Sequence, residues 1–297
     1  MWPVAANLIV TLFPAVVGQG WGFVLGFFDF IEEPENLEVG VDKIQGKDVT
    51  LAELTSAALT DVGRRRPNNE DALISLPEHG VFCVADGMGG QAEGEVASQA
   101  VVDAYRRVFD AADERGKNGV VYDSRELSSR AMQEACRWIF DRSQARGTQG
   151  SGTTAVTLVF GDHPLQGAMI QHAGDSRVYR FRGRTLELCT TDHSVAALAG
   201  VADEASLPAM FRGMVTRAVG VQETVEIEET GVDVRCGDLF LVCSDGLTRM
   251  IPDLEIARIL EKSDRSDMSK IAQKLVDRAN EEGGDDNISV ILVAIPA

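Results

Sequence analysis

Short apolar runs that end abruptly in aspartate and glycine are the sequence feature that most restricts how this chain can fold. Residues 81–85 precede Asp86-Gly87, and residues 239–243 precede Ser244-Asp245-Gly246. Runs of this length, rich in β-branched and aromatic residues, are typical of strands, and Asp-Gly pairs are typical of turns. Four further runs look alike and are also predicted as strands: 153–160, 168–172, 176–181 and 288–295.

Between these runs, apolar residues recur at the spacing of amphipathic helices. The predicted helices are 92–109, 125–145, 252–262 and 267–282, with Pro252 expected in a first turn and Gly283-Gly284 after a last one. The predicted strands form hairpin-like groups, such as 167–182 followed by 184–190 around Gly183. That grouping favours antiparallel sheets with helices on their outer faces, so the predicted class is α+β rather than a doubly wound sheet.

The charge balance excludes whole classes of partner. The 297 residues include 28 Lys and Arg against 46 Asp and Glu, a net charge of −18. Because such a field repels phosphate backbones, we expect no nucleic-acid partner and no non-specific binding to an anionic membrane. The 5 cysteines are widely spaced, with no Cys-x-x-Cys pair. We therefore expect neither a disulfide framework nor a thiolate zinc site, and a reducing, cytoplasmic location.

The N-terminal segment, residues 1–51, differs from the rest of the chain. Residues 2–28 carry no charged side chain, and the first lysine is Lys43. The run is long enough to cross a bilayer, but prolines and glycines interrupt it and no basic region precedes it, which argues against a signal peptide. Three interpretations stay open: a membrane anchor, an extension packed on the domain, or a misassigned translation start. An acidic linker, 29–38, would then lead to a single domain at 52–297.

Carboxylates stand at the ends of the apolar runs and in the glycine turns. A carboxylate after a buried strand is held on a rigid element, and a neighbouring glycine lets a ligand approach closely. One Asp-Gly pair is more often only a turn, but several converging carboxylates would repel one another unless cations held them together. Ligand sets of oxygen alone select Mg²⁺ or Mn²⁺ over zinc. The residues that predict such a site are Glu70, Asp71, Asp86, Asp175, Asp245 and Asp286.

A series of short motifs, in order along the chain, makes the sequence resemble a known family. The motifs are TDVG (60–63) with RPNNED (66–71), VADGMGG (84–90), SGTT (151–154), AGDSR (173–177), TDHS (191–194), TRAVG (216–220), CSDGLT (243–248) and GDDN (284–287). Over about residues 52–296 the chain resembles the metal-dependent serine/threonine protein phosphatases of type 2C, in their bacterial form. The resemblance implies a four-layer α-β-β-α sandwich, in which two antiparallel sheets pack face to face between helices.

The resemblance also implies a binuclear metal centre. Asp86 would bridge two Mg²⁺ or Mn²⁺ ions, the Gly87 carbonyl would bind one of them, and Asp245 and Asp286 would bind the other. A hydroxide bridging the two ions would then hydrolyse phosphoserine and phosphothreonine in proteins. Phosphorylated proteins would be the substrates, and a cognate serine/threonine kinase would act in opposition.

The remaining site residues follow from the same resemblance. Glu70 and Asp71 would hold ion-bound waters or one ion directly, and Asp175 would support a third, weaker ion. Arg66 would bind the substrate phosphate, because a planar guanidinium suits two phosphate oxygens. Met88 stands where eukaryotic members often have a histidine that serves as general acid, which leaves the proton donor to the leaving group open.

Two alternatives compete with this interpretation. The segment from Cys243 to Arg249 has the C-x₂-G-x₂-R spacing of cysteine-dependent phosphatases. Against it, Asp245 would place a carboxylate in a loop built for a phosphate dianion. The second alternative is a phosphatase-like sensor or scaffold without catalysis, which predicts missing ligands, whereas the predicted ligands are all present. His193, in a polar turn, is expected to make a structural hydrogen bond rather than act in catalysis.

Overall fold

The structure is a computed structural model that describes residues 49–89, 93–117, 121–201 and 206–297. Most of the apolar N-terminal segment and its acidic linker, up to residue 48, lies outside the described residues, as does residue 92 at the start of a predicted helix. In the part of the chain that is described, no helix combines the length and the apolar character needed to cross a bilayer.

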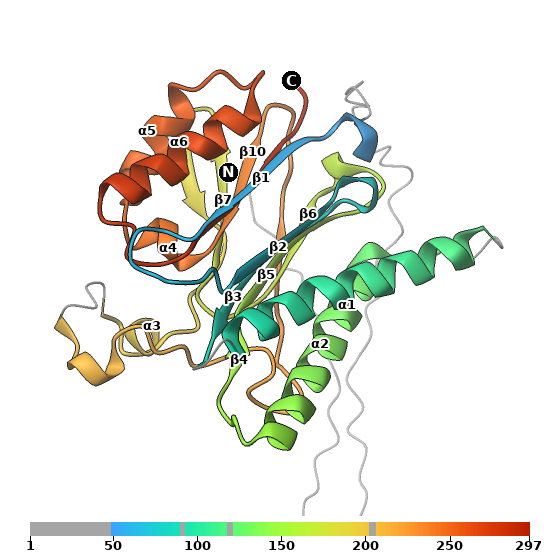
Figure 1. Ribbon diagram of the computed structural model, residues 1–297. Coiled ribbons are helices and arrows are strands. Elements are labelled where there is room, and N and C mark those ends of the chain that lie inside the picture. The colour runs from blue at the N-terminus through green and yellow to red at the C-terminus, as the bar shows by residue number, and fades with distance from the viewer. Residues whose placement is uncertain (1–48, 90–92, 118–120, 202–205) are drawn as a thin grey trace, which may run out of the picture. The chain divides into compact units, whose positions relative to one another are not determined.

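Two antiparallel sheets form the centre of the domain (Figure 1). The first has the strand order β1 (Thr55–Asp61), β11 (Ile288–Ala294), β10 (Leu239–Cys243), β7 (Arg177–Arg182) and β8 (Thr185–Leu188). The second has the order β2 (Asp71–Leu76), β3 (Val81–Met88), β5 (Ala155–Phe160), β6 (Ala168–Ala173) and β9 (Glu228–Val232), and the short β4 (Gly152–Thr153) pairs with β3.

Helices cover the outer face of each sheet (Figure 1). The long helices α1 (Glu93–Gly116) and α2 (Ser124–Arg146) lie on the β2–β9 sheet. The other sheet is covered by α4 (Asp245–Thr248), α5 (Asp253–Glu261) and α6 (Met268–Glu281). The predicted α+β class and the four-layer α-β-β-α sandwich are therefore confirmed. The remaining short pieces are α3 (Val195–Leu198) and 3₁₀ turns at Leu51–Glu53, Pro77–His79, Pro164–Gln166 and Ala209–Phe211.

Burial on both faces explains why the central strands are continuously apolar. In β10, Leu241 and Cys243 pack against the α4–α6 helices, whereas Phe240 and Val242 pack between the two sheets. Phe240 meets Phe160 of the other sheet edge to face, with ring centroids 5.7 Å apart. Successive side chains of a strand point to opposite faces, so a strand buried on both faces favours apolar residues at most positions.

The expected elements agree with the structure closely but not everywhere. The strand expected at 153–160 is broken at Thr154, whose backbone N–H donates to Asp86 O (2.8 Å) and whose hydroxyl contacts Ser176 Oγ (2.8 Å). Pro252 caps α5 from just outside rather than lying in its first turn. Three strands were not predicted: β1, β2 and β9.

Candidate metal centre and active site

The turns at one end of the two sheets bring the predicted carboxylates together. Asp71 and Asp86 face each other across the antiparallel pair of β2 and β3. Asp175 lies in the turn between β6 and β7, Asp245 begins α4 directly after β10, and Asp286 lies just before β11. Because β10 pairs with both β7 and β11, the last three turns are neighbours at one edge of their sheet.

One cavity of about 210 Å³ is lined by all but one of the predicted site residues. They are Arg66, Glu70, Asp86, Gly87, Asp175, Asp245 and Asp286. The exception is Asp71, which lies behind the cavity wall with 8% of its surface exposed. Its Oδ2 accepts a hydrogen bond from Ser244 Oγ at 2.8 Å. Asp71 is therefore close to the centre without lining the cavity as Glu70 does.

Crowding and burial disfavour the ionised form of these carboxylates. Burial, followed by the charges of Asp71, Asp245 and Asp175, raises the pKa of Asp86 well above its usual range. Burial and the charge of Asp245 raise the pKa of Asp175 to about 7. The pKa of Asp71 is also raised to about 7, first by burial and then by the nearby carboxylates. Carboxylates crowded together in this way are stabilised either by binding protons or by binding cations.

The donor set fits hard divalent cations. Carboxylates supply the ionisable donors that line the cavity, and no histidine or cysteine is among its described lining residues. In addition, Asp71 Oδ1 is buried and accepts no hydrogen bond from any described residue. A buried carboxylate oxygen without a donor is costly unless a cation lies nearby. Oxygen donors of this type match the preferences of Mg²⁺ and Mn²⁺.

Comparison with known proteins agrees with this geometry. Residues 64–292 match the family described as protein phosphatase 2C, over about three quarters of the chain. The chain belongs to the protein phosphatase 2C family. The predicted resemblance to metal-dependent serine/threonine protein phosphatases of type 2C is thus confirmed.

Bacterial relatives and solved structures resemble this phosphatase 2C chain along most of its length. The serine/threonine phosphatase stp of Listeria welshimeri is 34% identical over 245 residues, which cover 79% of this chain and 93% of the relative. PppA of Pseudomonas aeruginosa has a TM-score of 0.70 and 33% identity, covering 84% of this chain and 99% of that structure. The catalytic domain of the serine/threonine protein phosphatase PstP, in complex with 2 manganese ions, has a TM-score of 0.69 and 29% identity, covering 82% and 99%.

The cysteine-dependent alternative does not agree with the structure. Cys243 is the last residue of β10, fully buried, and its side chain packs against the helices rather than into the cavity. Burial raises the pKa of its thiol to about 12. The thiol is therefore neutral at physiological pH, and Arg249 pairs with Asp245 instead of facing Cys243.

Two residues near the cavity were not predicted to belong to the metal centre. Asn287 Oδ1 accepts a hydrogen bond from the Glu70 N–H at 2.8 Å, and its Nδ2 donates to the carbonyls of Val62 and Asn68, both at 2.9 Å. Asn287 thus fixes the 62–70 loop, which carries Arg66, against the start of β11. The other residue is Arg249. The signal for Asn287 was its place beside Asp286 at a strand end, but its three partners are distant in sequence.

His193 makes the structural hydrogen bond expected of it. Its Nδ1 accepts from the Gly174 N–H at 3.1 Å, next to Asp175, and its Nε2 lies 3.0 Å from Glu228 Oε2. His172 stacks on it with ring centroids 4.4 Å apart. Together with Glu228 the two histidines offer ligand atoms within 4.8 Å of one another. However, a guanidinium nitrogen of Arg217 lies 3.0 Å from His193 Nε2, and its charge opposes a metal ion there.

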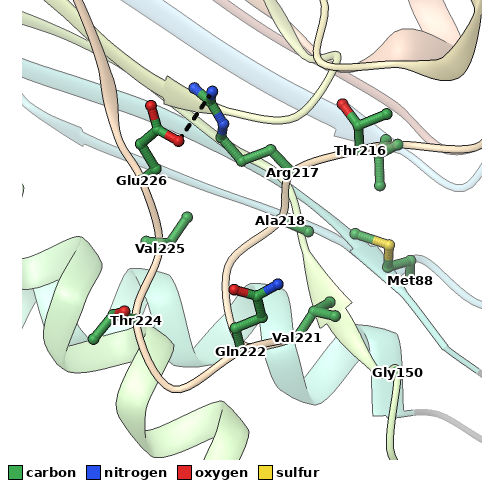
Figure 2. A pocket seen from close by; sticks show the side chains of 11 residues that line it. Met88, Gly150, Thr216, Arg217, Ala218, Val221, Gln222, Thr224, Val225 and Glu226 are labelled. Atoms are coloured by element: carbon green, nitrogen blue, oxygen red, sulfur yellow. Dashed lines mark ion pairs between the residues drawn. The ribbon is translucent and has the colours of Figure 1, made fainter.

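A second cavity, of about 330 Å³, adjoins the first (Figure 2). Met88 and Val215 line both cavities, so the second one begins where the first ends. Figure 2 shows Met88 on one side of it and the ion pair of Arg217 and Glu226, with a separation of 3.4 Å, on the other. This cavity extends the space beside the carboxylates along the 215–226 segment.

Metal binding should stabilise the protein more at neutral than at acidic pH. The Asp71 and Asp175 carboxyls titrate near pH 7 in the metal-free fold and near their ordinary value of 3.8 when unfolded. The folded state therefore binds more protons between about pH 4 and 7, and the metal-free protein loses stability as the pH rises through that window. Divalent cations bound among the carboxylates would favour their ionised forms and so displace those protons. Thermal unfolding with and without Mn²⁺ should show a larger rise in Tm at about pH 7.5 than at about pH 5.5. Equal rises would contradict this prediction.

Proposed function

We propose that this chain hydrolyses phosphoserine and phosphothreonine in proteins, using two divalent cations, Mg²⁺ or Mn²⁺. The observation that carries the proposal is the convergence of carboxylates from distant parts of the sequence on one cavity that also contains arginine. Asp86, the Gly87 carbonyl, Asp245 and Asp286 would hold the ions, with Glu70 beside them and Asp71 behind. When bound, such ions would activate the attacking water and neutralise charge on the phosphate oxygens.

Arg66 would bind and orient the substrate phosphate. Its Nη2 donates to Asp286 Oδ2 at 2.8 Å, and 48% of its side chain remains exposed at the cavity. The remaining N–H groups of the planar fork can reach two phosphate oxygens, which fixes the phosphorus for in-line attack by water. Met88 lines the same cavity and has no proton to give, so this chain does not use a residue at that position as general acid.

The proposed substrates are phosphorylated proteins, and the proposed partner in signalling is a serine/threonine kinase that supplies them. The names of the relatives support this choice, since the Listeria and Mycobacterium proteins are called serine/threonine phosphatases. We propose that residues 52–297 form the catalytic domain.

Chelation and thiol alkylation distinguish this function from its alternatives. The full chain is assayed on a phosphothreonine peptide with Mn²⁺ or Mg²⁺. We expect phosphate release that EDTA abolishes, that added metal restores and that iodoacetamide leaves unchanged. Loss on alkylation with resistance to EDTA would instead support the cysteine mechanism. A folded, metal-loaded protein without turnover on any phosphopeptide would support the silent sensor or scaffold.

A further inference from the structure

Arg249 lies inside the carboxylate cluster, where the sequence suggested no role for it beside the metal centre. It directly follows α4 and comes four residues after Asp245, so the two side chains lie on the same side of this single helical turn. Its Nη2 lies 2.7 Å from Asp245 Oδ2 and 3.6 Å from Asp175 Oδ2. The guanidinium therefore bridges the carboxylate expected to support a third, weaker ion and a carboxylate expected to hold one of the main pair.

The surroundings keep the guanidinium in that place. Asp175 and Asp245 are nearly buried, with 8% and 12% of their side chains exposed, against 37% for Arg249. Gly213 lies against the guanidinium so closely that a Cβ there would come within 3.1 Å of Nη2. On the far side, a cavity of about 500 Å³ is lined by the same three side chains, so Arg249 forms part of the wall between this cavity and the catalytic one.

We propose that Arg249 occupies the place of a third divalent cation between Asp175 and Asp245, and so limits the centre to two ions. The inference rests on the proposed function. A divalent ion bound between these two carboxylates would meet a guanidinium at contact distance, and the like charges would repel. An arginine stays protonated at all physiological pH values and cannot dissociate from the protein, so the charge it supplies does not vary with the metal concentration.

The charges of the centre agree with two ions. Its six carboxylates, with the guanidiniums of Arg66 and Arg249, leave four formal negative charges, which two divalent cations neutralise. The carboxylates are Glu70, Asp71, Asp86, Asp175, Asp245 and Asp286. Removing Arg249 leaves a fifth negative charge and opens the position between Asp175 and Asp245, so a further cation should enter.

Counting bound ions tests the proposal without relying on turnover. Equilibrium dialysis of the full chain against Mn²⁺, followed by elemental analysis, gives the number of ions for each chain. We expect two ions in the wild type, three in Arg249→Ala and in Arg249→Gln, and two again in Arg249→Ala combined with Asp175→Asn. The matched control is Arg65→Ala, which removes an exposed arginine that pairs with Asp285 at 3.6 Å, outside the cavity. This control should bind two ions.

The outcomes separate this inference from the function on which it rests. Two ions in both the wild type and the Arg249 variants would overturn the inference and leave the proposed function unaffected. Three ions in the wild type would have the same consequence. Fewer than two ions in the wild type would overturn the two-ion proposal itself. Circular dichroism on each variant confirms the fold, and Arg249→Gln, which keeps most of the side-chain volume, provides the count if the alanine variant unfolds.

Discussion

Replacing Asp86 by asparagine should lower the turnover of a phosphothreonine peptide by about a thousandfold or more, at saturating Mn²⁺. Asp86 lies on β3, opposite Asp71, and lines the cavity between the carboxylates of both sheets. Asparagine has nearly the same volume but no charge, so it removes the proposed bridge between the ions without opening a hole. The measurement is kcat from phosphate release, compared with the wild type under the same conditions.

The same substitution should leave the metal-free fold at least as stable as before. Burial and the neighbouring carboxylates raise the pKa of Asp86, so its ionised form is unfavourable when no cation is present. The metal-free variant should therefore unfold at the same temperature as the metal-free wild type or at a higher one, while the rise in Tm on adding Mn²⁺ becomes smaller. Loss of turnover with loss of fold would point to a structural role instead.

Asp285→Asn is the matched control for this prediction. Asp285 stands beside Asp286 in the sequence, but it pairs with exposed Arg65, has 64% of its side chain exposed and does not line the cavity. Its removal should change turnover less than twofold, because an exposed ion pair of this kind contributes little. If Asp86→Asn and Asp285→Asn were both fully active, the assignment of Asp86 to the metal centre would be wrong.

The strands that could be predicted from the sequence are those whose burial alone determines their composition. The middle strands β3, β5, β10 and β11 are buried almost throughout, so their sequences are mostly apolar. The strands β1 and β9 lie at sheet edges and consist of exposed and half-buried residues, including acidic and glycine positions in β9. Their pairing partners stabilise them, and partners distant in sequence leave no local signal.

Some residues of the site could likewise be predicted from local sequence, and others could not. Aspartates beside a glycine and a strand end were predictable, because that local arrangement both holds a carboxylate and exposes it. Glu70 and Asp71 show the limit of such reasoning: both are acidic and adjacent in the sequence, but only Glu70 lines the cavity, whereas Asp71 is buried and accepts a hydrogen bond from Ser244. The contact of Arg249 with Asp175, and those of Asn287 with Val62 and Asn68, join residues far apart in the sequence, which only the fold brings together.

Replacing Gly246 by alanine should destabilise the protein by about 2–4 kcal/mol and weaken Mn²⁺ binding at least about tenfold. Gly246 is buried in α4, directly after Asp245. A Cβ there would lie 1.9 Å from the carbonyl oxygen of Asn287 and 3.4 Å from Asp286 Cβ. The backbones of these two turns must therefore move apart, and the separation of Asp245 from Asp286 increases with them.

Helix propensity alone predicts that Gly246→Ala raises the stability of the protein, so the direction of the measured change distinguishes the two effects. Alanine is favoured over glycine in a helix by about 1 kcal/mol, so a substitution without a clash would stabilise α4. The overlap with a backbone oxygen is larger than this gain, because that oxygen belongs to a turn fixed by the hydrogen bonds of Asn287. Urea unfolding of the metal-free chain and a Mn²⁺ titration measure the two effects. The control is Gly231→Ala in β9. Nothing lies within 4 Å of the Cβ position there, so the stability of this variant should differ from the wild type by less than about 0.5 kcal/mol.

If Gly246→Ala unfolded at the wild-type urea concentration and bound Mn²⁺ equally well, the close approach of these two turns would not be what holds Asp245 and Asp286 together.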